Sequence, residues 1–207
     1  MIGIFGGTFD PVHIGHLRLA TEVAETLGLS QVHLVPAAIP PHRGEPLLDP
    51  ATRLDLVARS IADEPRFVLD DREHRRAGPS YTADTLAEFA AEFPNEPLVL
   101  MMGMDAFNGL PDWHEVERIL ELAHIAVATR PGSQAEGRAG EWLAERRADP
   151  ADPAALAALA DAPVGRIVPV AITRLDISAT TLRGFIDQGR SLRYLVPDPV
   201  VRHFSRG

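Results

Sequence analysis

The sequence predicts an α/β protein built on a doubly wound, mostly parallel sheet with helices on both faces. Two observations carry this prediction. Short apolar runs alternate with segments of helical periodicity along most of the 207 residues. The first apolar run also passes through a glycine-rich turn directly into a helix. Parallel strands need such crossovers, so a chain that alternates the two elements favours this class.

The first unit begins with a strand at Ile2 to Phe5, which Gly6 and Gly7 end. A helix is expected after the turn, because apolar residues recur at helical spacing as far as Gly28. These residues are Leu17, Ala20, Val23, Ala24 and Leu27.

The alternation then continues to the end of the chain. Further strands are expected at 31–36, 67–69, 98–102, 125–129 and 166–171. Helices are expected at 50–63, where Asp49 and Pro50 form the N-cap and first turn, and then at 82–93, 113–122, 178–188 and 197–204.

We expect residues 1–207 to form a single domain, because a chain of this length can bury one sizeable core. A peripheral helical insertion is expected at about 131–163, where Pro131-Gly132 and a turn-rich stretch interrupt the rhythm. A C-terminal helical end is expected at about 178–207. The charged segment 72–76 is expected on the surface, with an assembly contact or a substrate-side patch as alternatives.

The composition narrows the class of partner. A formal net charge of −9 argues against a nucleic-acid surface, which needs a basic stripe. Every cationic side chain is arginine, so one arginine alone says little about phosphate binding. The absence of cysteine excludes disulfides and thiolate nucleophiles. No membrane span or signal peptide is visible, so we expect a cytoplasmic protein without a membrane partner; the oligomeric state, a homo-oligomer included, stays open.

The stretch from Gly6 to His16 is typical of a phosphate-binding turn. Gly6 and Gly7 let backbone approach a ligand, and Thr8 offers a hydroxyl and an amide. His13 and His16 lie three residues apart at the positive end of a helix, where they can bind phosphate oxygens. Simple capping and metal binding are the alternatives, but no third metal ligand lies at a suitable local spacing.

Four loops follow predicted strands and should meet at one edge of the sheet. They are 6–16, 37–43, 103–105 and 177–183. Doubly wound sheets bind ligands at the carboxyl ends of their strands, where the strand order reverses.

The string Gly7-Thr8-Phe9-Asp10-Pro11 with His13-x-Gly-His16 resembles the signature of the nucleotidyltransferases that share a His-x-Gly-His element with class I aminoacyl-tRNA synthetases. The resemblance implies a Rossmann-like fold and adenylyl transfer, with His13, His16 and Arg183 as catalytic residues. It implies that ATP is bound by Gly6, Gly7, Thr8, Phe9, His13, His16, Gly103, Asp105, Ile177, Ser178, Thr180 and Arg183.

The second half of that ATP site is the segment 177–183, which resembles the Ile-Ser-Ser-Thr-x-Ile-Arg element of the same superfamily. Ser178, Thr180 and the helix amides would bind phosphates, and Arg183 would counter charge on the leaving pyrophosphate. Ala179 stands where the commonest pattern has a second serine. That change removes one hydroxyl.

The acceptor is indicated by other segments. Residues 40–43, 78–86, 102–105, 110–113 and 130–132 together resemble the nicotinate-nucleotide adenylyltransferase family. Trp113 offers a flat surface for a nicotinate ring, and Tyr81-Thr82 opens a helix whose amides can face the ring carboxylate. The resemblance implies that nicotinate mononucleotide is bound by Gly7, Thr8, His42, Arg43, Tyr81, Thr82, Asp105, Trp113 and Arg130.

The implied reaction joins ATP and nicotinate mononucleotide to give deamido-NAD and pyrophosphate. The acceptor phosphate is already ionised, so no general base is required and catalysis rests on positioning and charge. Mg²⁺ is expected to arrive with ATP, without a dedicated protein cage. The alternatives are the same chemistry on phosphopantetheine or nicotinamide mononucleotide, and a nucleotide sensor without activity.

Overall fold

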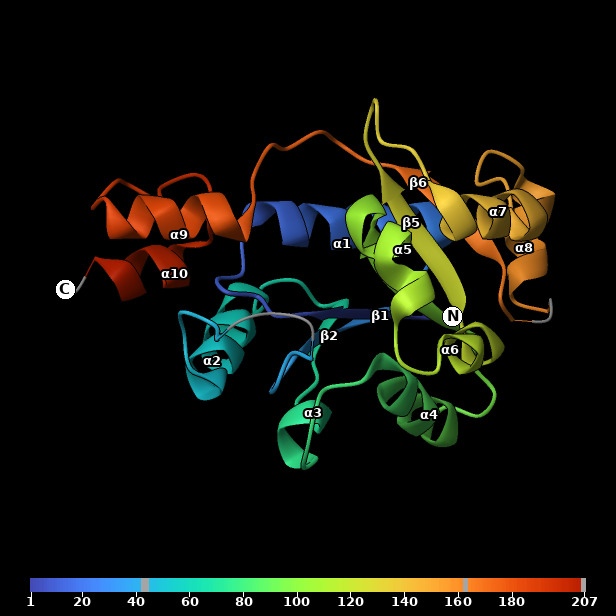
Figure 1. Cartoon of the computed structure of the whole chain (residues 1–207), viewed down its shortest axis with the longest axis horizontal. Coiled ribbons are helices and arrows are strands. Elements are labelled where there is room, and N and C mark those ends of the chain that lie inside the picture. The colour runs from blue at the N-terminus through green and yellow to red at the C-terminus, as the bar shows by residue number, and fades with distance from the viewer. Residues whose placement is uncertain (42–44, 162–163, 206–207) are drawn as a thin grey trace.

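The computed structural model describes residues 1–41, 45–161 and 164–205. Within these ranges one six-stranded sheet runs in the order β3-β2-β1-β4-β5-β6, and every neighbouring pair is parallel (Figure 1). This confirms the predicted fold class. The strands are β1 (Ile2–Gly7), β2 (Gln31–Pro36), β3 (Phe67–Leu69), β4 (Leu98–Gly103), β5 (His124–Thr129) and β6 (Ile167–Ala171).

Helices connect the strands on both sides of the sheet (Figure 1). They are α1 (Ile14–Leu27), α2 (Pro50–Ser60), α3 (Arg72–Arg75), α4 (Thr82–Glu92), α5 (Met104–Gly109), the 3₁₀ helix η1 (Leu110–Asp112), α6 (Val116–Leu122), α7 (Gly137–Arg146), α8 (Pro153–Leu159), α9 (Ala179–Asp187) and α10 (Asp198–Phe204). No helix in the described part of the chain is both long and apolar enough to cross a membrane.

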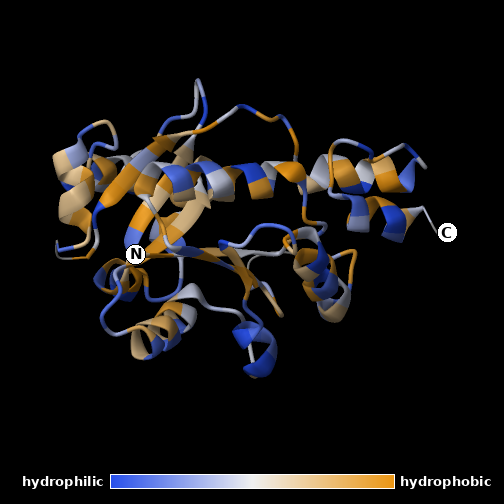
Figure 2. Ribbon diagram, turned by 180° about the vertical axis from the view of Figure 1, so that it is seen from behind, coloured by the Kyte–Doolittle hydropathy of each residue, from blue (hydrophilic) through white to orange (hydrophobic). Residues whose placement is uncertain are grey.

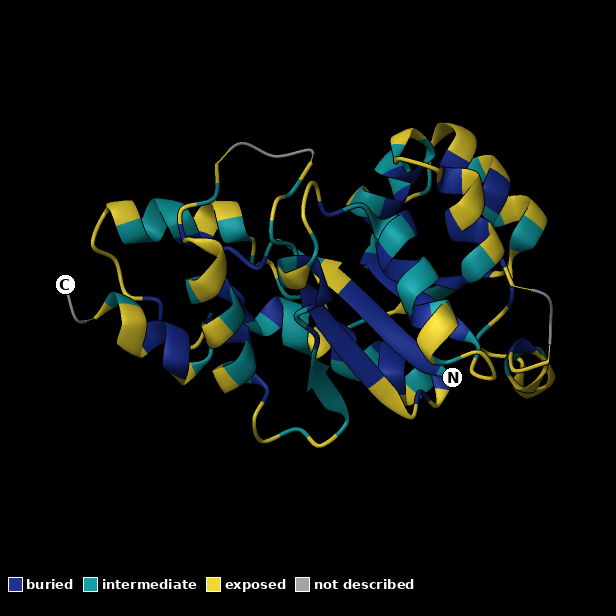
Figure 3. Ribbon diagram, turned by 90° about the horizontal axis from the view of Figure 1, so that it is seen from below, coloured by how far each residue is buried: buried dark blue, intermediate teal, exposed yellow. Residues whose placement is uncertain are grey.

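The strands are apolar throughout because both faces of the sheet are covered. In β4, Val99 and Met101 belong to one hydrophobic cluster, and Leu98, Leu100 and Met102 belong to the other. Alternate residues of a strand point to opposite faces, so the clusters lie on opposite sides. The first receives residues of α1, α2, α9 and α10, and the second receives residues of α4, α5, α6 and α7. The central strands are accordingly hydrophobic and buried in Figures 2 and 3.

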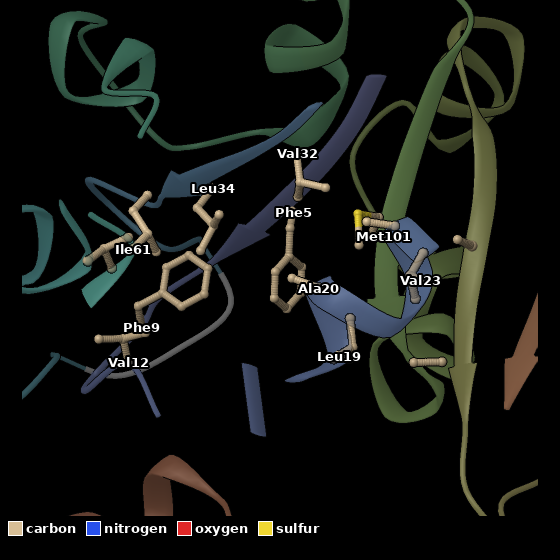
Figure 4. Packing of buried hydrophobic residues seen from close by; sticks show 14 of the residues in the cluster. Phe5, Phe9, Val12, Leu19, Ala20, Val23, Val32, Leu34, Ile61 and Met101 are labelled. Atoms are coloured by element: carbon tan, nitrogen blue, oxygen red, sulfur yellow. The ribbon is translucent and has the colours of Figure 1, made fainter. Parts of the chain in front are cut away.

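The strand order reverses around β1, and this positions the site. β1 pairs with β2 on one side and with β4 on the other, so the loops after β1 and β4 flank a crevice. At the end of β1 the ring of Phe9 is buried next to Val12 and Leu34 (Figure 4). It lies edge-on to Phe5, with the ring centroids 5.6 Å apart. The turn is therefore fixed to the core by an aromatic side chain.

Several predicted boundaries were wrong. α2 ends at Ser60 instead of Asp63. The predicted helix at 113–122 begins only at Val116, because Trp113 is extended and Glu115 has a left-handed backbone with φ of 50°. Residues 104–112, where only a loop at 103–105 was expected and no element was predicted, form α5 and η1.

The surface prediction for 72–76 was also wrong at two positions. Arg72 and Glu73 are only 7% and 6% exposed. The Arg72 guanidinium donates to Asp70 at 2.8 Å and to Glu92 at 2.9 Å. The Arg72 charge is therefore buried with carboxylate partners, and the run of charged residues in the sequence does not show this pairing.

The segment 131–163 contains α7 and α8 in its described part. Trp142 of α7 is buried in the second cluster, and Leu159 of α8 is buried in the first. The two helices therefore contribute side chains to the core on both sides of the sheet.

Candidate functional site

A cavity of about 550 Å³ lies at the carboxyl edge of the central strands. It is lined by the turn after β1, the start of α1, the loops after β2 and β4, the start of α4, and the segment before α9. Its size is within the range of small-molecule sites. The loops that the sequence expected to converge do meet here, except for residues 42–44, which lie outside the described residues.

Two glycines leave room for a ligand in this cavity. A Cβ atom added to Gly6 or to Gly103 would meet no heavy atom within 4 Å. Both glycines line the cavity, so a ligand can approach the backbone at the ends of β1 and β4. Gly15 has a different role, because a Cβ there would come within 3.0 Å of the His13 ring.

His13 and His16 form a stacked pair at the start of α1. Their ring centroids are 3.5 Å apart and their planes differ by 19°. The main-chain N–H of each residue donates to Nδ1 of the other at 3.3 Å, so His13 is the N-cap and His16 completes a capping box. Since both Nδ1 atoms accept hydrogen bonds, each neutral ring carries its proton on Nε2. Each ring can thus donate a hydrogen bond from Nε2 in its neutral form.

His13 is kept neutral by its surroundings. Burial, and secondarily the positive charge of Arg130, lower the pKa of His13 from 6.5 to about 4. The side chain is 5% exposed and lines the cavity. A protonated ring would be favoured only after an anion enters beside it, which suits a phosphate site.

The second phosphate motif lines the same cavity as the histidines. Ile177, Ser178, Ala179 and Thr180 all line the cavity. Ser178 caps α9 by accepting from the Thr181 N–H at 3.1 Å. The segment is fastened to α1, because the Glu22 carboxylate accepts from both the N–H and the hydroxyl of Thr173 at 2.6 Å.

Arg183 does not line the cavity with the rest of its motif. Its Nη1 donates to the Asp10 carbonyl at 3.0 Å, and its Nη2 donates to the Thr180 hydroxyl at 3.1 Å. The Asp10 carboxylate, 3.7 Å away, also accepts the N–H groups of Leu47 and Leu48. Arg183 therefore joins the second motif to the first turn.

The other end of the cavity is built by the start of α4 and by Trp113. Among the described residues no side chain caps the first turn of α4, so its N–H groups are available to a ligand. Tyr81, at the N-cap, packs against the His114 ring with the centroids 4.2 Å apart. Trp113, half-buried, packs against the second hydrophobic cluster and lines the cavity from the other side.

A hydroxyl connects this end of the cavity to the loop after β2. Ser80 Oγ accepts from the N–H groups of Ala38 and Ile39 at 3.1 and 3.2 Å. Ser80 also hydrogen-bonds the carboxylate of Glu73, which accepts from the Thr85 hydroxyl at 2.7 Å. Burial raises the pKa of Glu73, and these hydrogen bonds oppose the rise.

The structure brings most of the predicted residues together. Arg183 is the described exception, and His42 and Arg43 lie outside the described residues. Phe9 reaches the cavity wall, but its side chain is 2% exposed and belongs to the core. Those that line the cavity are Gly6, Gly7, Thr8, Phe9, His13, His16, Tyr81, Thr82, Gly103, Asp105, Trp113, Arg130, Ile177, Ser178 and Thr180.

Sequence reasoning missed Glu73, Ser80 and His114, which also line the cavity. Ser80 and His114 directly adjoin predicted residues, and that adjacency was the available signal. Glu73 lies in the charged segment 72–76, for which a substrate-side patch was one of the alternatives to the favoured surface position.

Comparison with known proteins places the chain among nucleotide-transferring enzymes. The profile of the cytidylyltransferase-like family matches residues 4–185. A protein of Halorhodospira halophila named "Probable nicotinate-nucleotide adenylyltransferase" is 46% identical over 202 residues, covering 96% of this chain and 90% of its own. A protein of Marinobacter nauticus with the same name is 48% identical over 200 residues, covering 95% and 90%.

A solved structure shows the same fold at low identity. Nicotinic acid mononucleotide adenylyltransferase of Plasmodium falciparum, complexed with NaAD, superposes with a TM-score of 0.74 at 15% identity. The match covers 99% of this chain and 94% of that one.

Proposed function

The chain belongs to the cytidylyltransferase-like family, and from this membership we propose how its cavity transfers an adenylyl group from ATP to nicotinate mononucleotide. The products are deamido-NAD and pyrophosphate, so the enzyme acts in NAD biosynthesis. The observation that carries the proposal is that the stacked pair of His13 and His16 and the 177–180 segment line one cavity.

ATP would occupy the end of the cavity between α1 and α9. The Nε2–H groups of His13 and His16 would donate to its phosphate oxygens, with Ser178 and Thr180 opposite them. Gly6 and Gly103 leave space for close backbone contact, and Asp105 offers a carboxylate to ribose hydroxyls. Arg183 holds positive charge beside the segment where pyrophosphate would leave.

Nicotinate mononucleotide would occupy the other end. Its ring would lie on Trp113, and its ring carboxylate would face the uncapped N–H groups at the start of α4. Such donors favour the acid over the amide, because an amide brings no negative charge to the helix terminus. His42, Arg43 and Arg130 are assigned to nicotinate mononucleotide on the resemblance alone.

The chemical step is a direct in-line displacement. An oxygen of the acceptor phosphate forms a bond to the α-phosphorus of ATP, and the bond from that phosphorus to the bridging β-phosphate oxygen breaks. Pyrophosphate leaves with the electron pair. No proton must be removed from the nucleophile, so the protein contributes positioning and hydrogen bonds to the charge that develops on oxygen.

A metal ion would be held mainly by the substrate. Within residues 1–41, 45–161 and 164–205 no group of three histidine, aspartate or glutamate side chains could hold an ion. We propose that Mg²⁺ enters with ATP, bound to phosphate oxygens and water, and supplies charge neutralisation there.

The test is pyrophosphate release from ATP with three acceptors. Nicotinate mononucleotide should be turned over far better than nicotinamide mononucleotide or phosphopantetheine. Preference for either of the others would refute the acceptor assignment, and ATP binding without pyrophosphate release would indicate a sensor. His16→Ala should lower kcat about 100-fold, whereas His203→Ala on α10, outside the cavity, should not.

A further inference from the structure

Arg53, on α2, is a fully buried cation beside the site rather than in it. Its side chain is 0% exposed, and it does not line the cavity. All the hydrogen bonds of its guanidinium to described residues end on main-chain carbonyl oxygens. Asp10 and Asp49 influence it electrostatically, without an ion pair among the described residues. Neither the sequence motifs nor the proposed chemistry gives this residue a role.

The guanidinium joins three segments of backbone. Nη1 donates to the carbonyls of Thr8 at 2.8 Å and Ala37 at 2.6 Å. Nη2 donates to the Ala38 carbonyl at 3.1 Å, and Nε donates to the Leu48 carbonyl at 3.2 Å. These carbonyls belong to the turn after β1, the loop after β2 and the approach to α2.

Two of these segments are proposed to contact substrate. Thr8 lies in the glycine-rich turn, which lines the cavity and is assigned to both ATP and the acceptor. Ala37 and Ala38 lead into the loop that Ser80 ties to the start of α4, where the acceptor ring is proposed to bind. The Ala37 N–H also donates to the Gly7 carbonyl at 2.9 Å, so turn and loop are in direct contact.

The hydrogen-bond geometry of Arg53 explains the presence of arginine at this position better than core packing does. Burying a charge is costly unless hydrogen bonds satisfy it, and an apolar side chain could fill the same space. A guanidinium presents five N–H donors in a rigid plane, and four of these bonds are made here. Lysine has three donors on one nitrogen and cannot reach the same set of carbonyls.

We propose that Arg53 is a positioning residue for adenylyl transfer. It fixes the turn after β1 and the loop after β2 relative to one another, and thereby sets the distance between the acceptor phosphate and the α-phosphorus of ATP. The inference rests on the proposed function. Small errors in such a distance lower the rate steeply, by about 100-fold for 1 Å.

The test compares Arg53→Lys with Arg72→Lys. Arg72 is a matched control, because it is also buried and multiply hydrogen-bonded, but it does not line the cavity and its guanidinium hydrogen-bonds Asp70 and Glu92. Both variants should melt at lower temperature than the wild type. Assayed well below both melting temperatures, R53K should lose 10- to 100-fold in kcat/KM for both substrates, and R72K should stay within twofold.

Arg53→Gln provides a second test if R53K does not fold. Glutamine retains an amide donor and removes the buried charge, and kcat/KM is again expected to fall at least tenfold for both substrates. Activity of the Arg53 variants within twofold of the wild type, or an equal loss in R72K, would overturn the proposal. Turnover of the three acceptors by the wild type is measured first, so a wrong acceptor assignment is detected separately. The Arg53 and Arg72 variants are then compared with the acceptor that the wild type turns over.

Discussion

The neutral state of His13 predicts how the stability of the free enzyme depends on pH. The pKa of this buried ring is about 4 in the folded protein, against 6.5 for an unperturbed histidine. As the pH falls, the unfolded chain therefore takes up a proton before the folded protein does. The stability associated with His13 is fully present above pH 6.5 and is lost as the pH falls from 6.5 towards 4.

The size of the loss follows from these two values. At pH 5 the unfolded ring is almost wholly protonated and the folded ring almost wholly neutral. The contribution of His13 to the free energy of unfolding is then about 2 kcal/mol smaller at pH 5 than at pH 7, since one pKa unit corresponds to about 1.4 kcal/mol. His13→Asn removes this titration but keeps a side chain that can accept the His16 N–H as an N-cap.

The assay is urea unfolding of the wild type and His13→Asn at pH 7 and pH 5. Between pH 7 and pH 5 the free energy of unfolding of the wild type should fall by about 2 kcal/mol more than that of the variant. His74 and His124, whose pKa values are also lowered by burial, contribute equally to both proteins. Equal losses in the two proteins would show that the ring is not held neutral. Saturating ATP should reduce this difference between the wild type and His13→Asn, because a phosphate beside His13 favours the charged ring.

Three further variants test the surrounding contacts. Burial alone would raise the pKa of Glu22, but hydrogen bonds from Thr173 and Arg18, with the charge of Arg18, outweigh burial and lower the pKa. Glu22→Gln should destabilise the protein by about 1 kcal/mol at pH 7 and raise the KM for ATP, and an unchanged KM would contradict the anchoring role. This stabilisation should disappear as the pH falls through the lowered pKa of Glu22, which urea unfolding can follow. Ser80→Ala should raise the KM for nicotinate mononucleotide about tenfold and leave the KM for ATP unchanged, because the loop after β2 loses its hydrogen bonds to Ser80. Thr85→Val is the control, because the Thr85 hydroxyl hydrogen-bonds Glu73 as Ser80 does. Trp113→Ala should raise the KM for the mononucleotide far more than that for ATP, and equal effects on both would mean that Trp113 serves only the core.

The sequence predicted the elements best where one local pattern decided the outcome. The alternation of apolar strands with helices, the glycine that ends α1 and the aspartate that caps α2 need no distant partner. It failed at 104–116, where Phe107, Leu110 and Val116 of three short helices are buried in the second hydrophobic cluster and Glu115 has a left-handed backbone. Local propensity is weak for elements of this length, so tertiary contacts determine them.

By itself, the sequence indicated the reaction, because its segments 6–16 and 177–183 resemble the motifs of a nucleotidyltransferase family, and it predicted that helices begin at both segments. Only the tertiary structure decided which other residues hold the loops around these motifs together. Arg53 ties Thr8 to Ala37, Ser80 ties Ala38 to Glu73, and both connect positions far apart along the chain. A hydrogen bond depends on where a carbonyl points in space, and no pattern of letters carries that direction.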